Sequence, residues 1–210
     1  MKKVLLFTLF LLCFTGCTSV REETIENIVI QGMTSNVDIT NVYRTGYKYY
    51  LPKGLKNINS HDYNEVIYSE RYAYYLYVDV VSYFNKIREE YQEDSSYYYS
   101  KALYKGNQFG YLQIKSLEED KYFIEIMYNY AKIEVMVFQE DIKEIVTYVM
   151  SIISSITYND NVIKNTLSSS RLDEFEESFN IFEIVGSDNY LQFSEEVVTD
   201  DRVKDPDYVN

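Results

Sequence analysis

The middle of the chain is dominated by apolar residues that alternate along extended segments. From Tyr72 to Phe84, apolar and aromatic side chains occupy most of the even and most of the odd positions. A period of two with both sets apolar is typical of a strand with two apolar faces, and a sheet of such strands is usually covered on both sides. The sequence therefore predicts one long strand over residues 72–84 inside a layered fold.

Further strands are predicted around this one. Strand-like patterns occur over residues 43–51, 65–69, 98–105, 111–117, 122–128 and 133–137. The segment Leu51-Pro52-Lys53-Gly54 predicts a type I turn, since proline suits the second position and glycine the fourth. Gly106–Gly110 predicts a hairpin loop, and the change of phase at residues 129–131 predicts a tight turn or a bulge.

One amphipathic helix follows the last pair of strands. Its apolar residues recur with the helical period after Glu140, at Ile142, Ile145, Val146, Val149, Ile152, Ile153 and Ile156. Such a stripe packs on a sheet. We also expect a helical turn at residues 161–167 and one or two closing strands within residues 175–193. Together these elements predict a single α+β domain, an antiparallel sheet flanked by helices.

The N-terminus has a different pattern. Lys2 and Lys3 precede Val4–Phe14, which is uncharged and mostly apolar, as in the basic and apolar regions of a signal peptide. A membrane-spanning helix needs about 20 apolar residues. An uncleaved membrane anchor is therefore the weaker alternative.

Residues 14–17, Phe-Thr-Gly-Cys, resemble the lipobox of bacterial lipoproteins, in which an aliphatic residue and two small residues precede the lipidated cysteine. Phe14 departs from the usual aliphatic residue. The resemblance implies that Cys17 is acylated and that two acyl chains hold the protein on the outer side of the cell membrane. Cys13 is the poorer candidate, because bulky leucines precede it. An ordinary secretory signal with a chance cysteine is the alternative.

These patterns divide the chain into four parts. Residues 1–16 are the predicted signal peptide, residues 17–40 a polar tether, residues 41–198 the domain and residues 199–210 an acidic tail. Within the tether, Asn27–Gln31 is predicted to form a first edge strand. The tail holds four aspartates and Pro206 and has no apolar period.

Charge and cysteine content narrow the function by exclusion. The net charge of −13 becomes −15 when Lys2 and Lys3 leave with the signal peptide, with 18 basic and 33 acidic residues remaining. Nucleic acid repels such a chain, so a nucleic-acid partner is excluded. With Cys17 acylated and Cys13 removed, no thiol remains for a disulfide or a metal site.

The layout of the domain resembles the PsbP-like and Mog-like fold. That fold is an α/β/α sandwich found in photosystem extrinsic proteins, a Ran-binding protein and several bacterial envelope lipoproteins. The resemblance covers residues 43–158: an early hairpin at Leu-Pro-Lys-Gly, a meander, the strand pair YFIEIMYNYAKIEVMVF and the helix DIKEIVTYVMSIISSITY. It implies a binding or assembly module, since most members have no known catalytic site, although a shared fold does not establish function.

Candidate catalytic chemistry is sparse. His61 is the single histidine and is predicted to lie in a loop, so a zinc site of the usual type cannot be assembled. Phosphate-binding glycine loops, the nucleophile elbow and the calcium-loop spacing are absent from the sequence. No cofactor, metal or catalytic residue is therefore predicted. With 33 acidic residues, a carboxylate pair of the glycosidase type stays open.

The 24 tyrosines are the unusual feature of the chain. Tyrosine is enriched at interfaces, but it is also a good strand former. If a tyrosine face binds anything, the odd-numbered set Tyr75, Tyr77 and Tyr83 is the candidate, because the even-numbered set is more aliphatic. The sequence thus favours a lipid-anchored envelope protein with a non-catalytic binding or assembly role, and a protein or glycan as its partner. A carboxylate-based envelope or glycan hydrolase is the main alternative, and a solute-capturing transporter lipoprotein is a weaker one.

Overall fold

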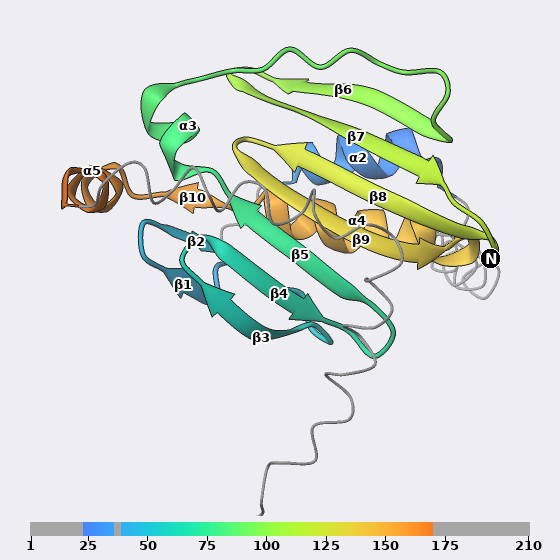
Figure 1. Cartoon of the computed structure of the whole chain (residues 1–210), viewed down its shortest axis with the longest axis horizontal. Coiled ribbons are helices and arrows are strands. Elements are labelled where there is room, and N and C mark those ends of the chain that lie inside the picture. Colours follow the sequence, from blue (N-terminus) through green and yellow to red (C-terminus); the bar gives the residue numbers. More distant parts are fainter. Residues whose placement is uncertain (1–22, 36–38, 170–210) are drawn as a thin grey trace, which may run out of the picture.

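The computed structural model describes residues 23–35 and 39–169, and it shows one α+β domain with two antiparallel sheets and flanking helices (Figure 1). The predicted fold class is confirmed. The large sheet has seven strands in the order β3-β4-β5-β9-β8-β7-β6, and the small sheet has the order β1-β2-β10. The strands of the large sheet are β3 (Lys56–His61), β4 (Asn64–Tyr68), β5 (Ala73–Val78), β6 (Tyr99–Lys105), β7 (Gln108–Ser116), β8 (Lys121–Tyr128) and β9 (Ala131–Phe138). The small sheet contains β1 (Val42–Arg44), β2 (Tyr47–Tyr49) and β10 (Thr157–Tyr158).

Two helices cover one face of the large sheet. Helix α4 (Ile142–Ile153) follows a short 3-10 turn at Gln139–Asp141 and packs on β8 and β9, and α2 (Ile25–Thr34) packs on α4. Figure 1 shows both helices behind the sheet, with α3 (Val80–Asn85) and α5 (Asp160–Ser169) near one end of the strands. Within the described part of the chain, no helix is both long and apolar enough to cross a membrane.

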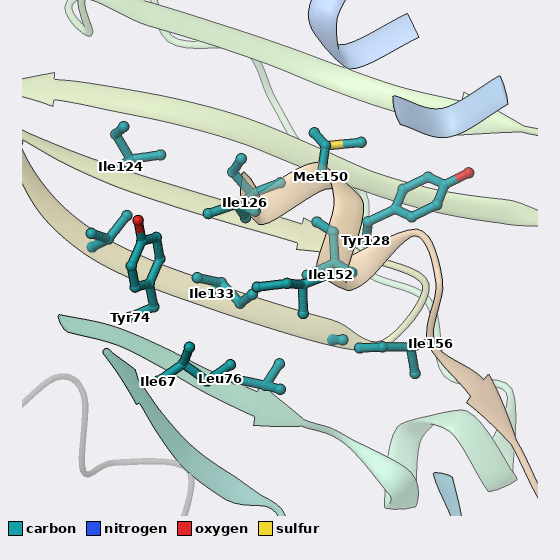
Figure 2. Packing of buried hydrophobic residues seen from close by; sticks show 14 of the residues in the cluster. Ile67, Tyr74, Leu76, Ile124, Ile126, Tyr128, Ile133, Met150, Ile152 and Ile156 are labelled. Atoms are coloured by element: carbon teal, nitrogen blue, oxygen red, sulfur yellow. The ribbon is translucent and has the colours of Figure 1, made fainter. Parts of the chain in front are cut away.

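The core lies between the sheet and α4. The predicted apolar stripe of the helix is buried there, and the alternating strands contribute one face each (Figure 2). The fully buried residues of this layer include Ile67, Leu76, Ile124, Ile126, Ile133, Met150 and Ile152. Alternation with period two therefore divides each long strand into a core face and an outer face.

The predicted edge strand at Asn27–Gln31 is wrong, because these residues belong to helix α2. Thr24 caps the helix, accepting a hydrogen bond from the Asn27 amide at 3.1 Å, as Thr commonly does at an N-cap. Ile28 and Val29 are buried in the core cluster. The predicted tether thus contains a helix that packs on the domain, and Gly32 allows its close approach, since a Cβ there would lie 2.7 Å from Met150 Cβ.

The long strand predicted over residues 72–84 is wrong in its second half. Strand β5 ends at Val78, and helix α3 begins at Val80. Asp79 causes this change, because its carboxylate accepts a hydrogen bond from the Ser82 amide at 2.8 Å and caps the helix. Lys86, with φ 57°, ends it in the left-handed region.

The early strand at residues 43–51 is divided by a turn at Gly46, where φ is 88°, into the hairpin β1-β2. The Leu-Pro-Lys-Gly segment does not close a hairpin, because it leads from the small sheet to β3. Its turn starts at Pro52, whose carbonyl accepts from the Leu55 amide at 3.2 Å, and Gly54 has φ 95°. The proline is therefore the first position of the turn, and the predicted type I register is one residue off.

The other predicted turns are present. Gly106 and Asn107 form a two-residue hairpin loop between β6 and β7, shorter than predicted. Asn129 and Tyr130, with φ 49° and 67°, join β8 to β9 as the predicted tight turn. The predicted turn at 161–167 belongs to α5. The signal peptide, Cys17, the strands predicted within 175–193 and the acidic tail lie outside the described residues.

Candidate functional site

The face of the large sheet opposite α4, here called the outer face, carries the candidate site. The strand registers place one set of polar side chains side by side across it, and we call this set the polar row. The polar row consists of Tyr75, Glu134, Glu125, Gln113 and Ser100, on β5, β9, β8, β7 and β6. The next set along the strands is Tyr77, Lys132, Met127, Tyr111 and Ala102. Among the described residues, no helix lies across these strands on this side (Figure 1).

Two carboxyl groups meet at the centre of the polar row. Glu125 and Glu134 are directly opposite each other on β8 and β9, and Glu134 is only 4% exposed. Burial raises the pKa of Glu134, and a hydrogen bond to Glu125 raises it further. Lys132 lowers this pKa, because its Nζ lies 2.7 Å from Glu134 Oε1. Like charges directly opposite are destabilising. The raised pKa of Glu134 lessens that repulsion, because the protonated carboxyl group carries no charge.

An aromatic pair covers one side of the carboxyl pair. The Tyr111 hydroxyl donates a hydrogen bond to Glu125, and the Tyr91 ring stacks on the Tyr111 ring with centroids 4.4 Å apart and planes 10° apart. Tyr91 lies in the connection between α3 and β6, and its hydroxyl donates to Gln113 Oε1 at 3.2 Å. This connection therefore shields the β6–β7 side of the outer face.

A small cleft of about 100 Å³ opens beside the second set, next to α3. Aromatic rings form its walls, and carboxylates and one ammonium line its rim. Its principal lining residues are Tyr77, Phe109, Tyr111, Tyr130, Asp79, Glu89 and Lys132. An apolar hollow with few convergent polar groups is the usual form of a small ligand site.

The structure brings two of the three predicted tyrosines together. Tyr75 and Tyr77 share the outer face, and Tyr77 lines the cleft. Tyr83 lies on α3, where its ring stacks on Tyr158 at 3.9 Å and meets Tyr130 edge-on at 5.6 Å. Burial, followed by a hydrogen bond to an aspartate, raises the pKa of Tyr83 to about 12. Tyr83 therefore supports a wall of the cleft through Tyr130 and does not belong to the strand face.

Sequence reasoning missed the carboxyl pair, although a signal for it exists. Glu125 and Glu134 are the acidic residues inside the two alternating apolar segments. Once the tight turn at Asn129 and Tyr130 is fixed, Tyr128 pairs with Ala131, and residue 125 must pair with residue 134. The prediction that His61 lies in a loop is wrong, because His61 is the last residue of β3. Its side chain is exposed, and its Nδ1 lies 3.0 Å from the carboxylate of the neighbouring Asp62.

A second buried carboxylate has a different environment. Glu65 is 1% exposed and pairs with Arg44 at 2.7 Å, and the hydroxyls of Tyr47 and Tyr49 donate to it at 2.6 and 2.9 Å. The Asn57 amide donates a fourth hydrogen bond. These groups connect the small sheet to β3 and β4. Because its neighbours satisfy Glu65 fully, we assign it to the stability of the fold.

The geometry of the outer face limits its chemistry. The carboxyl groups of Glu125 and Glu134 are in hydrogen-bond contact, closer than the roughly 5 to 9.5 Å that separates the catalytic carboxyls of glycosidases. Within the described residues, no three His, Cys, Asp or Glu side chains are grouped so that they could hold a metal ion. Comparison of the chain with models of known protein families and with curated protein sequences finds no match.

Proposed function

We propose that this protein is a lipoprotein of the bacterial cell envelope, anchored by Cys17 on the outer side of the membrane, and that its outer face binds a glycan without catalysis. The observation that carries the proposal is the polar row, a line of side chains with hydrogen-bond acceptors set beside aromatic rings, in which every member except the buried Glu134 is partly exposed. The lipobox-like residues 14–17 support the location.

The anchor can be tested directly. Cells are fed an alkyne fatty acid, and labelling of the wild-type protein is compared with that of Cys17→Ala and Cys13→Ala. Because only the cysteine after the small residues is expected to be acylated, Cys17→Ala should lose the label and Cys13→Ala should keep it. Labelling that survives in Cys17→Ala refutes the anchor.

Charge and hydrogen bonding favour a glycan over a protein partner. The centre of the outer face presents Glu125, Glu134 and Gln113, whose oxygens are acceptors. Sugar hydroxyls can donate to the acceptor positions that Tyr111 and Tyr91 leave open on the partly exposed Glu125 and Gln113. An apolar protein surface would remove these oxygens from water without offering donors, which is costly. The ring of Tyr75, which is half-buried on the same face, offers apolar surface for the C–H face of a sugar ring.

Binding is tested by co-sedimentation of the purified protein with insoluble cell-wall glycan. Tyr75→Ala removes a ring from the outer face, and we expect a loss of about 1 kcal/mol, or roughly fivefold in affinity. Tyr43→Ala is the matched control, because Tyr43 is 67% exposed on the small sheet. The glycan proposal fails if both variants sediment as the wild type does, or if the wild type stays in solution while crosslinking captures a protein partner.

The alternative of a hydrolase gains no support from this site. Retaining and inverting glycosidases need room for a nucleophilic attack or for a water molecule between their carboxyl groups. Glu125 and Glu134 leave none, since they hydrogen-bond to each other. We therefore propose a binding role.

A further inference from the structure

The small cleft beside α3 continues the outer face toward one end of its strands. Tyr111 and Lys132 line the cleft, and each lies two residues along its strand from a member of the polar row, Gln113 and Glu134 respectively. Two residues of extended chain span about 7 Å, which is comparable with the width of one sugar ring. A sugar that contacts the polar row can therefore place a substituent in the cleft.

The floor of the cleft is apolar. Tyr77, Phe109 and Tyr130 are largely buried and present part of their rings to it, and Met127 adds a thioether side chain. The volume of the cleft is about 100 Å³, whereas one water needs only about 10–15 Å³ of such space. A group of a few heavy atoms therefore fits, and its apolar part is stabilised by leaving water against this floor.

The rim of the cleft carries charges of both signs. Asp79 and Glu89 contribute carboxylates, and Lys132 contributes an ammonium. The Arg88 guanidinium lies 5.4 Å from the centroid of the Phe109 ring. A cationic ligand would meet Lys132 and Arg88, and an anionic ligand would meet the two carboxylates. Because a charge is costly to remove from water unless it is well paired, this rim favours a neutral group that has both a donor and an acceptor.

Asp79 and Ser82 offer the two hydrogen bonds that a secondary amide needs. The Asp79 carboxylate accepts from the Ser82 backbone amide at 2.8 Å through one oxygen, and a carboxylate has about four acceptor positions. It can therefore also accept from the N–H of a ligand. Ser82 lines the same cleft, and its hydroxyl can donate to a carbonyl oxygen.

We propose that this cleft receives the acetamido group of an N-acetylated amino sugar within a glycan that lies on the outer face. The amide N–H donates to Asp79, the carbonyl oxygen accepts from the Ser82 hydroxyl, and the methyl group packs on the aromatic floor. This inference rests on the proposed glycan binding and names the class of glycan. A sugar with a hydroxyl in place of the acetamido group leaves the floor in contact with water.

The test is calorimetric titration of the full-length protein with tri-N-acetylchitotriose and with cellotriose, which has the same β-linked backbone and hydroxyl groups in place of the acetamido groups. We expect the acetylated sugar to bind at least about tenfold more tightly, because it gains a buried methyl group and the amide hydrogen bonds. Equal binding of the two sugars overturns this inference and leaves the glycan proposal standing. If neither sugar binds, both are overturned.

Ile87→Ser tests the contact with the cleft. Ile87 lines the cleft and is 49% exposed, so shortening it removes apolar surface beside the acetamido methyl without opening the core. We expect the acetylated sugar to bind about fivefold more weakly and cellotriose to bind as before. Ile58→Ser is the matched control, because Ile58 is also 49% exposed but lies on edge strand β3. An equal loss of affinity in both variants overturns the inference.

Ser82→Ala tests the hydrogen bond to the carbonyl oxygen. The substitution removes the hydroxyl and keeps the backbone amide that Asp79 caps, so we expect an unchanged melting temperature. The affinity for the acetylated sugar should fall about fivefold, as expected for loss of one hydrogen bond, and the affinity for cellotriose should not change. The inference is overturned if either Ser82→Ala or Ile87→Ser binds the acetylated sugar as tightly as the wild type does.

Discussion

Glu65→Ala is expected to be one of the most destabilising substitutions in the described domain. The side chain of Glu65 is fully buried and has four partners, from β1, β2 and β3. Removing one member of a buried ion pair costs about 3–5 kcal/mol, and each orphaned buried hydroxyl adds about 1 kcal/mol or more. With Arg44 and the two tyrosines Tyr47 and Tyr49 losing their acceptor, we expect a loss of about 5 kcal/mol.

That loss is a large part of the typical 5–15 kcal/mol by which a domain is stable, so a milder variant is needed beside it. In Glu65→Gln, one orientation of the amide keeps an oxygen toward Arg44, Tyr49 and Asn57 and donates to the Tyr47 hydroxyl. The charge is lost but the hydrogen bonds remain, and we expect about half the destabilisation of Glu65→Ala.

Urea unfolding followed by circular dichroism measures these differences in the free energy of unfolding. Glu119→Ala is the matched control, because the Glu119 side chain is 78% exposed and forms an ion pair with Lys121 at 3.0 Å. An exposed ion pair contributes at most about 1 kcal/mol. If Glu65→Ala costs no more than this control, the four contacts do not stabilise the docking of the small sheet, and our reasoning is refuted.

Three further substitutions probe the outer face and its supports. Burial raises the pKa of Glu134. The contribution of Glu134 to stability is therefore fully present below its unfolded pKa of about 4.3 and is lost as the pH rises through its folded pKa. Urea unfolding at a series of pH values should show this loss of stability in the wild type and a smaller loss in Glu134→Gln. Gly110→Ala would place a Cβ 2.0 Å from the Met127 carbonyl oxygen, and calorimetry should show a loss of at least about 1–3 kcal/mol; an unchanged melting temperature would contradict the close approach. Asp79→Ala removes the cap on the Ser82 amide and should cost about 1 kcal/mol, with less helical ellipticity as a second readout.

The long elements were predictable because their patterns repeat. Strands β7, β8 and β9 and helix α4 each contain several full periods, and the same period places Tyr75 and Tyr77 on one face. Strand β3 was missed because its sequence KNINSH has no apolar alternation, as suits an edge strand that is mostly exposed. An edge position removes the burial that produces the pattern.

The errors at α2 and α3 have another cause. Both segments are rich in β-branched or aromatic residues, which favours strand by local propensity. In α2, Ile25, Ile28, Val29 and Met33 follow helical spacing, and α4 supplies the apolar surface that this stripe needs. In α3, a single capping aspartate decides the outcome. Tertiary packing outweighed local strand propensity in α2, and one capping hydrogen bond outweighed it in α3.

The two buried glutamates show why pattern alone could not find the site. Each interrupts an apolar strand, and nothing in the local sequence distinguishes Glu65 from Glu134. Glu65 is surrounded by four donors of the protein itself, so no acceptor capacity is left for another molecule. Glu134 instead shares its contacts with one lysine and with Glu125, which stays partly exposed on an open face. A buried carboxyl group whose partners leave acceptors at the surface is the one that can serve a ligand, and only the strand register shows which of the two it is.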